Sequence, residues 1–135
     1  MLRLAAALLG GSLVALVLAG SAPVSADDKG MTTEGIMKKL HGKNGSHKQI
    51  IKALDGEPDW DVITKHAKIY AEITPQLSKN KPEKGDDKSW QTLSKAYAAE
   101  AKALSDAAAK KDKEAVKTVF GKLKDSCEAC HENHR

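Results

Sequence analysis

Cysteine is absent from the first 126 of the 135 residues, and its two occurrences, Cys127 and Cys130, both fall within the last nine. After residue 26 there is also hardly a run of alternating β-branched or aromatic residues, which argues against a sheet-based fold. Apolar residues instead recur every three or four positions, as they do in amphipathic helices. Internal repeats are absent as well. The sequence therefore predicts an all-α chain.

The sequence also lacks a basic run interleaved with aromatic residues. Lys and Arg number 22 against 18 Asp and Glu, a formal net charge of +4 at pH 7. The lysines are scattered among acids at helical spacing, a pattern typical of solvated helix faces. We therefore expect no nucleic-acid partner.

The longest apolar run lies at the N-terminus, where it has the three parts of a secretory signal. Arg3 supplies a basic start, the apolar run covers residues 4–19, and small residues end at Ala26. An uncleaved anchor needs about 20 strongly apolar residues, whereas Gly10 and Gly11 interrupt this run. We expect residues 1–26 to be a signal peptide cleaved after Ala26, which leaves an exported, periplasmic protein with no membrane segment.

The remaining residues 27–135 are expected to form one small domain of 109 residues. Cleavage removes one basic residue and no acid, so the net charge falls from +4 to +3. We expect this mild excess to steer association with an acidic redox partner, mainly through the on-rate and its salt dependence.

Three helices have clear limits in the sequence. One opens at EPDWD, residues 57–61, and should bend or end at Pro75. A second covers about Asp87 to Lys110, with Asp86 or Asp87 as its cap. The third begins near Asp112 and leads at helical steps to the terminal motif, which should face inward.

The first helix is less regular. Ile36, Met37 and Leu40 form an apolar stripe, which HGKNGSHKQ then interrupts. Ser46 followed by Gln49 reads as a capping box that restarts the helix, so a kink or short loop is expected inside it. Four helices with short connections favour an antiparallel four-helix bundle.

The terminal stretch CEACHENHR contains Cys127, Cys130 and His131 at the Cys-x-x-Cys-His spacing of c-type haem attachment. Two thiols three apart on one helix face can each add to a vinyl group of one porphyrin, while the adjacent imidazole ligates the iron. Three rivals fit less well. A thioredoxin-like pair belongs in a βαβ setting, which this sequence lacks. The side chains of consecutive Cys130 and His131 point apart on a helix, so they fit tetrahedral zinc coordination poorly. A disulfide between Cys127 and Cys130 would strain the helix.

This motif at the end of a four-helix chain resembles the class II c-type cytochromes, the group of cytochrome c′ and its low-spin relatives, as does the GIMKK segment. The resemblance implies one covalent haem c bound at the C-terminal helix, with Arg135 at the arginine position of the family motif. It also implies a possible homodimer. Because an electron carrier requires no substrate pocket or catalytic base, we expect no enzymatic activity. His134 departs from the family, which usually has Phe or Tyr there, and its role stays open.

The distal iron ligand has several candidates on the first helix. Methionine-bearing, low-spin members of the family place their ligand where this chain has Met37, although methionine also fills irregular core gaps. His41, one turn later on the same face, is the alternative ligand, but it also suits a helix end before Gly42. His47 is a third inward candidate, but it lies ten residues beyond Met37, too far along a continuous helix to share the iron unless the Gly-rich break folds the chain back. His66 is more typical of a surface or satisfied histidine.

Two functions follow from the choice of ligand. Methionine at the sixth position suits an electron-carrying cytochrome with a raised potential. A five-coordinate haem, as in cytochrome c′ proper, would instead bind nitric oxide or another diatomic gas. A haem-free thiol or zinc protein is the third reading, and it would be colourless.

Overall fold

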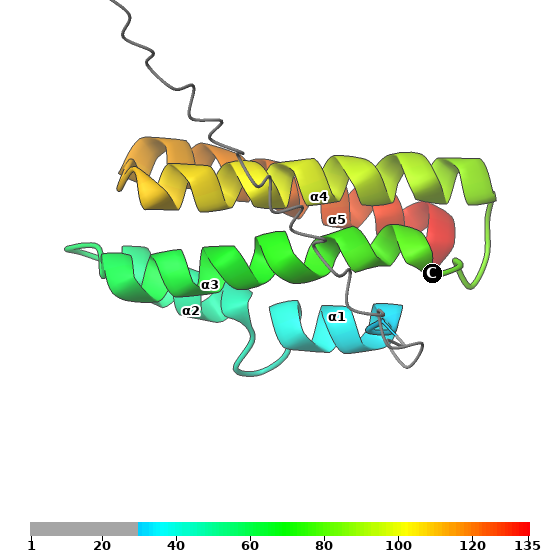
Figure 1. The fold of residues 1–135 in the computed structure, drawn as a ribbon, viewed down its shortest axis with the longest axis horizontal. Helices are drawn as coiled ribbons and strands as arrows, with labels where there is room; N and C mark the ends of the chain where they lie inside the picture. Colours follow the sequence, from blue (N-terminus) through cyan, green and yellow to red (C-terminus); the bar gives the residue numbers. More distant parts are fainter. Residues whose placement is uncertain (1–29) are drawn as a thin grey trace, which may run out of the picture.

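The computed structural model describes residues 30–135, and the signal peptide and cleavage site predicted within residues 1–26 lie outside this range. The described part is helical and contains no strand (Figure 1). Its elements are α1 (Thr33–His41), α2 (Ser46–Leu54), α3 (Trp60–Ile73), the 3₁₀ helix η1 (Thr74–Lys79), α4 (Asp87–Ala109) and α5 (Lys113–His134). Together α1 and α2 take the place of the first helix of a four-helix bundle, so the predicted fold class is confirmed.

Aspartate caps begin the three long helices. The side chains of Asp59, Asp86 and Asp112 each accept a hydrogen bond from the backbone N–H three residues later, at 3.1, 2.8 and 2.9 Å. Each bond satisfies one of the free donors of a helix start. The predicted starts near Asp86 and Asp112 are confirmed. Pro75 follows α3 inside η1 and so ends the α-helix, as expected.

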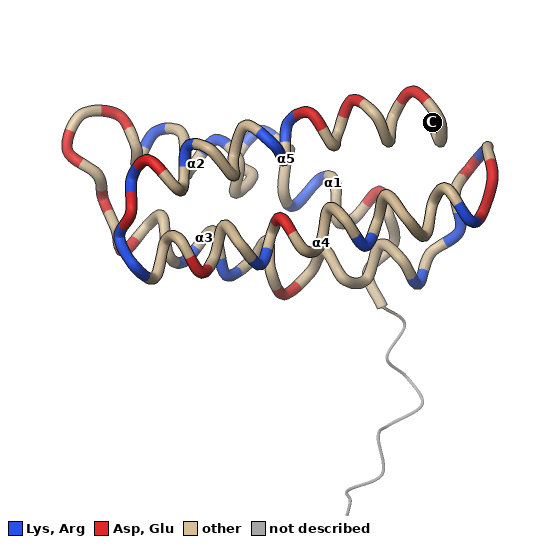
Figure 2. Tube along the Cα trace, turned by 90° about the horizontal axis from the view of Figure 1, so that it is seen from above, with Lys and Arg blue, Asp and Glu red and all other residues tan. Residues whose placement is uncertain are grey.

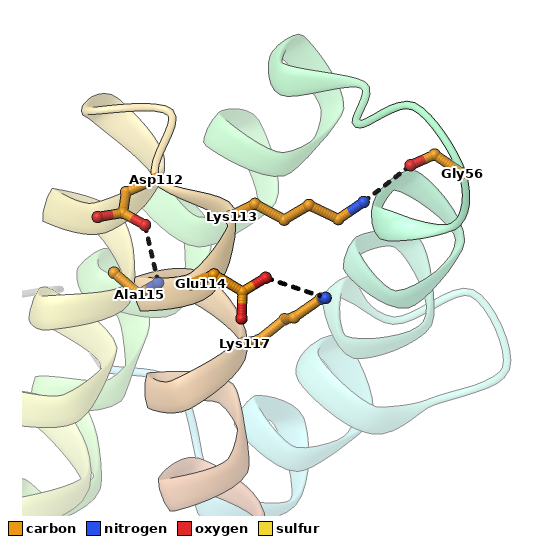
Figure 3. A network of polar contacts seen from close by, with 6 residues as sticks. All are labelled: Gly56, Asp112, Lys113, Glu114, Ala115 and Lys117. Carbon is orange, nitrogen blue, oxygen red and sulfur yellow. Dashed lines mark hydrogen bonds and ion pairs between the residues drawn. The ribbon is translucent and has the colours of Figure 1, made fainter.

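The start of α5 is also tied to the rest of the bundle (Figure 3). Lys113 Nζ donates to the carbonyl oxygen of Gly56, in the loop between α2 and α3, at 2.8 Å. Lys117 pairs with Glu114 at 3.2 Å on the exposed side of the same turn. The Lys113 contact connects the N-terminal end of α5 to the loop between α2 and α3, while the other end of α5 carries the terminal motif.

The break between α1 and α2 differs in detail from the prediction. Gly45, not Ser46, is the N-cap of α2, and Ser46 Oγ instead contacts His66 Nδ1 at 3.1 Å. The predicted capping box is therefore wrong. The chain passes so close to itself that a Cβ on Gly45 would lie 2.5 Å from the Leu40 carbonyl oxygen. Glycine is needed at this position. The helix therefore begins one residue earlier than a Ser46 cap would give.

The core lies along the length of the bundle and is mostly aliphatic. Tyr70 is the largest side chain that is fully buried. Trp90 and Tyr97 are also buried on α4, where they lie on one apolar stripe at helical spacing. On α2, Ile50 is buried whereas the adjacent Ile51 is 50% exposed. Within residues 30–135 the helices are too short or too polar to cross a membrane.

Candidate functional site

The last three turns of α5 form one wall of a cavity of about 680 Å³. Cys127, Cys130, His131 and Arg135, the four residues predicted to hold the cofactor, all line it. The α4 wall contributes Trp90, Leu93, Ser94 and Tyr97. The volume lies within the range of about 300–1,000 Å³ that cofactor and ligand pockets occupy.

The first helix supplies another part of the wall. Met37 and His41, the two candidate distal ligands, line the same cavity as the terminal motif, together with Thr33 and Glu34. The bundle thus brings together positions that are about 90 residues apart in the sequence. His47 and His66 do not line the cavity, although the His47 ring lies next to that of His41, with ring centroids 5.2 Å apart.

His41 is held inside the protein by a hydrogen bond. Its Nε2 lies 3.1 Å from the Tyr97 hydroxyl. Burial, followed by the nearby His47 and His131, lowers the pKa of His41 to about 4, so its imidazole is neutral at pH 7. The Tyr97 oxygen also accepts from the Cys127 thiol at 4.0 Å. Whichever of the two groups donates, Nε2 of His41 is engaged with Tyr97, and a bond from this nitrogen to iron would have to replace that contact.

His47 and His66 have packing partners of their own. His47 stacks on Phe120 with ring centroids 4.6 Å apart, and its Nδ1 lies 3.4 Å from the Tyr70 hydroxyl. His66 contacts Ser46, as described above. Both rings therefore have structural roles outside the cavity, as expected for His66.

His134, the position that departs from the family pattern, is buried and fixes the end of α5. Its Nδ1 lies 3.0 Å from the carbonyl oxygen of Lys84 and its Nε2 lies 3.1 Å from Ser89 Oγ. Since a carbonyl can only accept, Nδ1 carries the proton and Nε2 accepts from Ser89. A Cβ on Gly85 would lie 2.6 Å from His134 Nδ1, so glycine permits this close approach. His134 therefore anchors the terminal motif to the loop before α4.

The two thiols are suited to covalent attachment of a cofactor and are poorly suited to redox catalysis. Cys127 and Cys130 are free and partly buried within the continuous helix α5. Burial raises the pKa of both thiols, which disfavours the thiolate needed for disulfide exchange. Among residues 30–135, no three His, Cys, Asp or Glu side chains are placed to hold a metal ion. A zinc site that includes His134 is further disfavoured, because both of its ring nitrogens are engaged.

Ser94 on α4 tests whether the cavity suits a polar cofactor. Three side-chain hydrogen bonds join α4 to α5, in the pairs Tyr97–Cys127, Glu100–Ser126 and Ser89–His134. This antiparallel register places Ser94 at the level of Cys130. Ser94 is 2% exposed and lines the cavity, yet its Oγ has no hydrogen-bond partner. Buried hydroxyls normally have one, and a polar atom of a bound cofactor would supply it. The residues present therefore fit such a group.

Sequence reasoning missed Ser94, although a signal for it was present. It is a polar residue on the apolar stripe of α4, between Trp90 and Tyr97. In the haem-loaded protein we expect Ser94→Ala to lower the free energy of unfolding by about 1 kcal/mol, because a satisfied buried hydrogen bond would be lost. Urea unfolding measures this change. Ser105→Ala, on the same helix but outside the cavity, is the control. Unchanged or raised stability in Ser94→Ala would show that the hydroxyl stays unpaired when the cavity is filled.

The fold and the site together define a class of protein. An all-α bundle whose last helix presents Cys-x-x-Cys-His to a cofactor-sized cavity is the arrangement of class II c-type cytochromes. The family model described as Cytochrome C′ matches residues 32–135, and the chain belongs to this family. Membership implies a covalently bound haem with iron.

A solved structure supports the same assignment. The chain is similar to cytochrome c′ from Thermochromatium tepidum, with 27% sequence identity and a TM-score of 0.52. The similarity covers 67% of this chain and 82% of that one. A search of curated proteins found no match.

Proposed function

We propose that the protein is an exported monohaem c-type cytochrome that carries single electrons. One observation carries the proposal. Cys127, Cys130 and His131 line the same cavity as Met37, which comes from the other end of the chain. A haem held there would supply a one-electron Fe(III)/Fe(II) couple. The protein would set its potential through the axial ligands and through burial.

The terminal motif would hold the cofactor. The thiols of Cys127 and Cys130 would each add across one vinyl group to form a thioether, with the thiol hydrogen passing to the second vinyl carbon. His131 has an exposed side chain at the cavity wall and would bind the iron through its imidazole. Arg135, one turn later, brings a positive charge to the cavity, where it can pair with a haem propionate.

Met37 would supply the second axial ligand. Its side chain is partly buried against the core and lines the cavity. A thioether needs no proton removal to bind iron, and sulfur ligation raises the reduction potential. The alternative ligand His41 has its Nε2 engaged with Tyr97, which favours Met37. An electron carrier of this kind needs no substrate pocket and no catalytic base, so we propose no enzymatic activity.

The proposed compartment rests on the sequence and on the chemistry. Thioether attachment takes place in an oxidising, extracytoplasmic space, which agrees with the predicted signal peptide. Cleavage after Ala26 would release the protein into the periplasm.

Absorption spectra of the purified mature protein test the function directly. We expect low-spin haem spectra in both oxidation states and reversible one-electron cycling in a redox titration, because His131 and Met37 would both bind the iron. A high-spin ferrous spectrum with ready binding of carbon monoxide or nitric oxide would replace electron transfer by the gas-binding function. A colourless protein expressed with a haem-attachment system would reject both.

A further inference from the structure

The net positive charge of residues 30–135 comes from the segment that forms the first two helices. Residues 33–54, which span α1 and α2, contain five lysines and one acid, Glu34. Residues 55–135 contain 15 basic and 15 acidic residues. The segment of α1 and α2 therefore carries +4, and the rest of the described helices are balanced.

We call the outer side of this segment, which carries the five lysines, the α1–α2 basic face. All five side chains are exposed, and Figure 2 marks Lys and Arg positions along the chain trace in blue. Its lysines are Lys38, Lys39, Lys43, Lys48 and Lys52. The ion pairs found within residues 30–135 lie on α4 and α5, so none of these lysines is neutralised by a salt bridge.

An exposed apolar side chain lies among these charges. Ile51 is 50% exposed and is the large hydrophobic residue that stands out on the described surface. It lies between Lys48 and Lys52 on α2. An apolar centre with a charged rim is the usual composition of a protein-docking patch.

The basic face also backs directly onto the candidate site. Met37 and His41 line the cavity from α1, and Lys38 and Lys39 directly follow Met37 on the outer side of the same helix. A partner seated on this face would be separated from the cavity by one helix, about 10 Å thick. On the other side of the cavity, residues 125–135 have three acids against Arg135, which would repel an acidic partner.

We propose that the α1–α2 basic face is the docking site for an acidic one-electron carrier protein, which exchanges electrons with the haem across α1. The inference rests on the proposed function. It adds the surface, the charge of the partner and the side of the cofactor from which electrons pass. Charge complementarity of this kind raises the association rate, and its effect falls with salt.

Flavodoxin in its hydroquinone form, an acidic one-electron donor, is a suitable probe. One electron passes from the flavin hydroquinone to ferric haem, giving the semiquinone and ferrous haem. We expect Lys38→Gln/Lys39→Gln to lower the second-order rate constant at low ionic strength by about threefold or more. The rates should converge at high salt. Stopped-flow absorbance measures them.

Lys65→Gln/Lys68→Gln is the matched control. It removes the same charge from α3, where both side chains line an open hollow beside Ala109 and not the cavity. We expect a much smaller effect. Equal slowing in both double variants would overturn the proposal, because net charge alone would then explain it. Zero-length carbodiimide crosslinking to flavodoxin should map to the lysines of the basic face, and crosslinks spread over α3 to α5 would also contradict it.

Two further measurements separate the possible failures. Reduction by dithionite shows whether the haem takes up electrons at all, so a protein that dithionite reduces but flavodoxin does not would reject the docking site alone. Phosphatidylglycerol vesicles test a membrane as the acidic surface. Vesicle binding that is lost in Lys38→Gln/Lys39→Gln, with unchanged flavodoxin rates, would replace the protein partner by a lipid one.

Discussion

Replacing Cys127 and Cys130 together by alanine should abolish covalent retention of haem. The wild-type mature protein, after denaturation, should be heavier than its 109-residue polypeptide by one haem, because two thioethers survive unfolding. The double variant should lose this added mass completely. Each single variant should retain haem through the remaining thioether. Mass spectrometry of the denatured proteins measures all four.

His131→Ala separates attachment from ligation. This variant keeps both thiols, so the haem mass should remain while the spectrum of the proximal imidazole is lost. Ser126→Ala, adjacent to Cys127 on α5, is the control and should change neither. A wild-type mass equal to that of the bare polypeptide would overturn the attachment motif. An unchanged spectrum in His131→Ala would show that another residue is the proximal ligand.

The parts of this fold that could be predicted from the sequence depend on neighbours within one helix. Asp86 and Asp112 act as caps through bonds to residues three positions later, and this pattern is visible in the sequence. The apolar stripe of α4 likewise follows from periodicity alone. Ser46 was misassigned because the approach of Gly45 to Leu40 depends on how the chain folds back between α1 and α2.

In the candidate site, too, local patterns could be predicted from the sequence, whereas contacts between distant segments could not. The spacing of Cys127, Cys130 and His131 was enough to predict an attachment motif facing inward. The partners of His41 and His134 lie 56 and 50 residues away in the sequence, so no local pattern could identify them. Ser94 needed the register between α4 and α5 before its position near Cys130 could be recognised. The excess of lysines on α1 and α2 could be connected with the candidate site only once the structure showed that α1 lines the cavity.

Replacing Met37 by leucine should open the sixth coordination position of the iron. Leucine has nearly the same volume and is apolar, so the packing of α1 should be kept while the sulfur ligand is lost. We expect a high-spin ferrous spectrum and new binding of carbon monoxide and nitric oxide. Absorption spectroscopy with and without each gas measures both effects.

His41→Gln is the matched comparison, because glutamine removes the imidazole but can keep a hydrogen bond to Tyr97. We expect its spectrum to remain low-spin. The pKa of His41 near 4 means that its ring is neutral above about pH 5, so proton competition does not prevent it from binding iron. What disfavours it is the bond between Nε2 and the Tyr97 hydroxyl, which iron ligation would have to break. If His41→Gln opens the iron and Met37→Leu does not, the haem has two histidine ligands. A lower reduction potential would then follow, since imidazole favours ferric iron more than a thioether does.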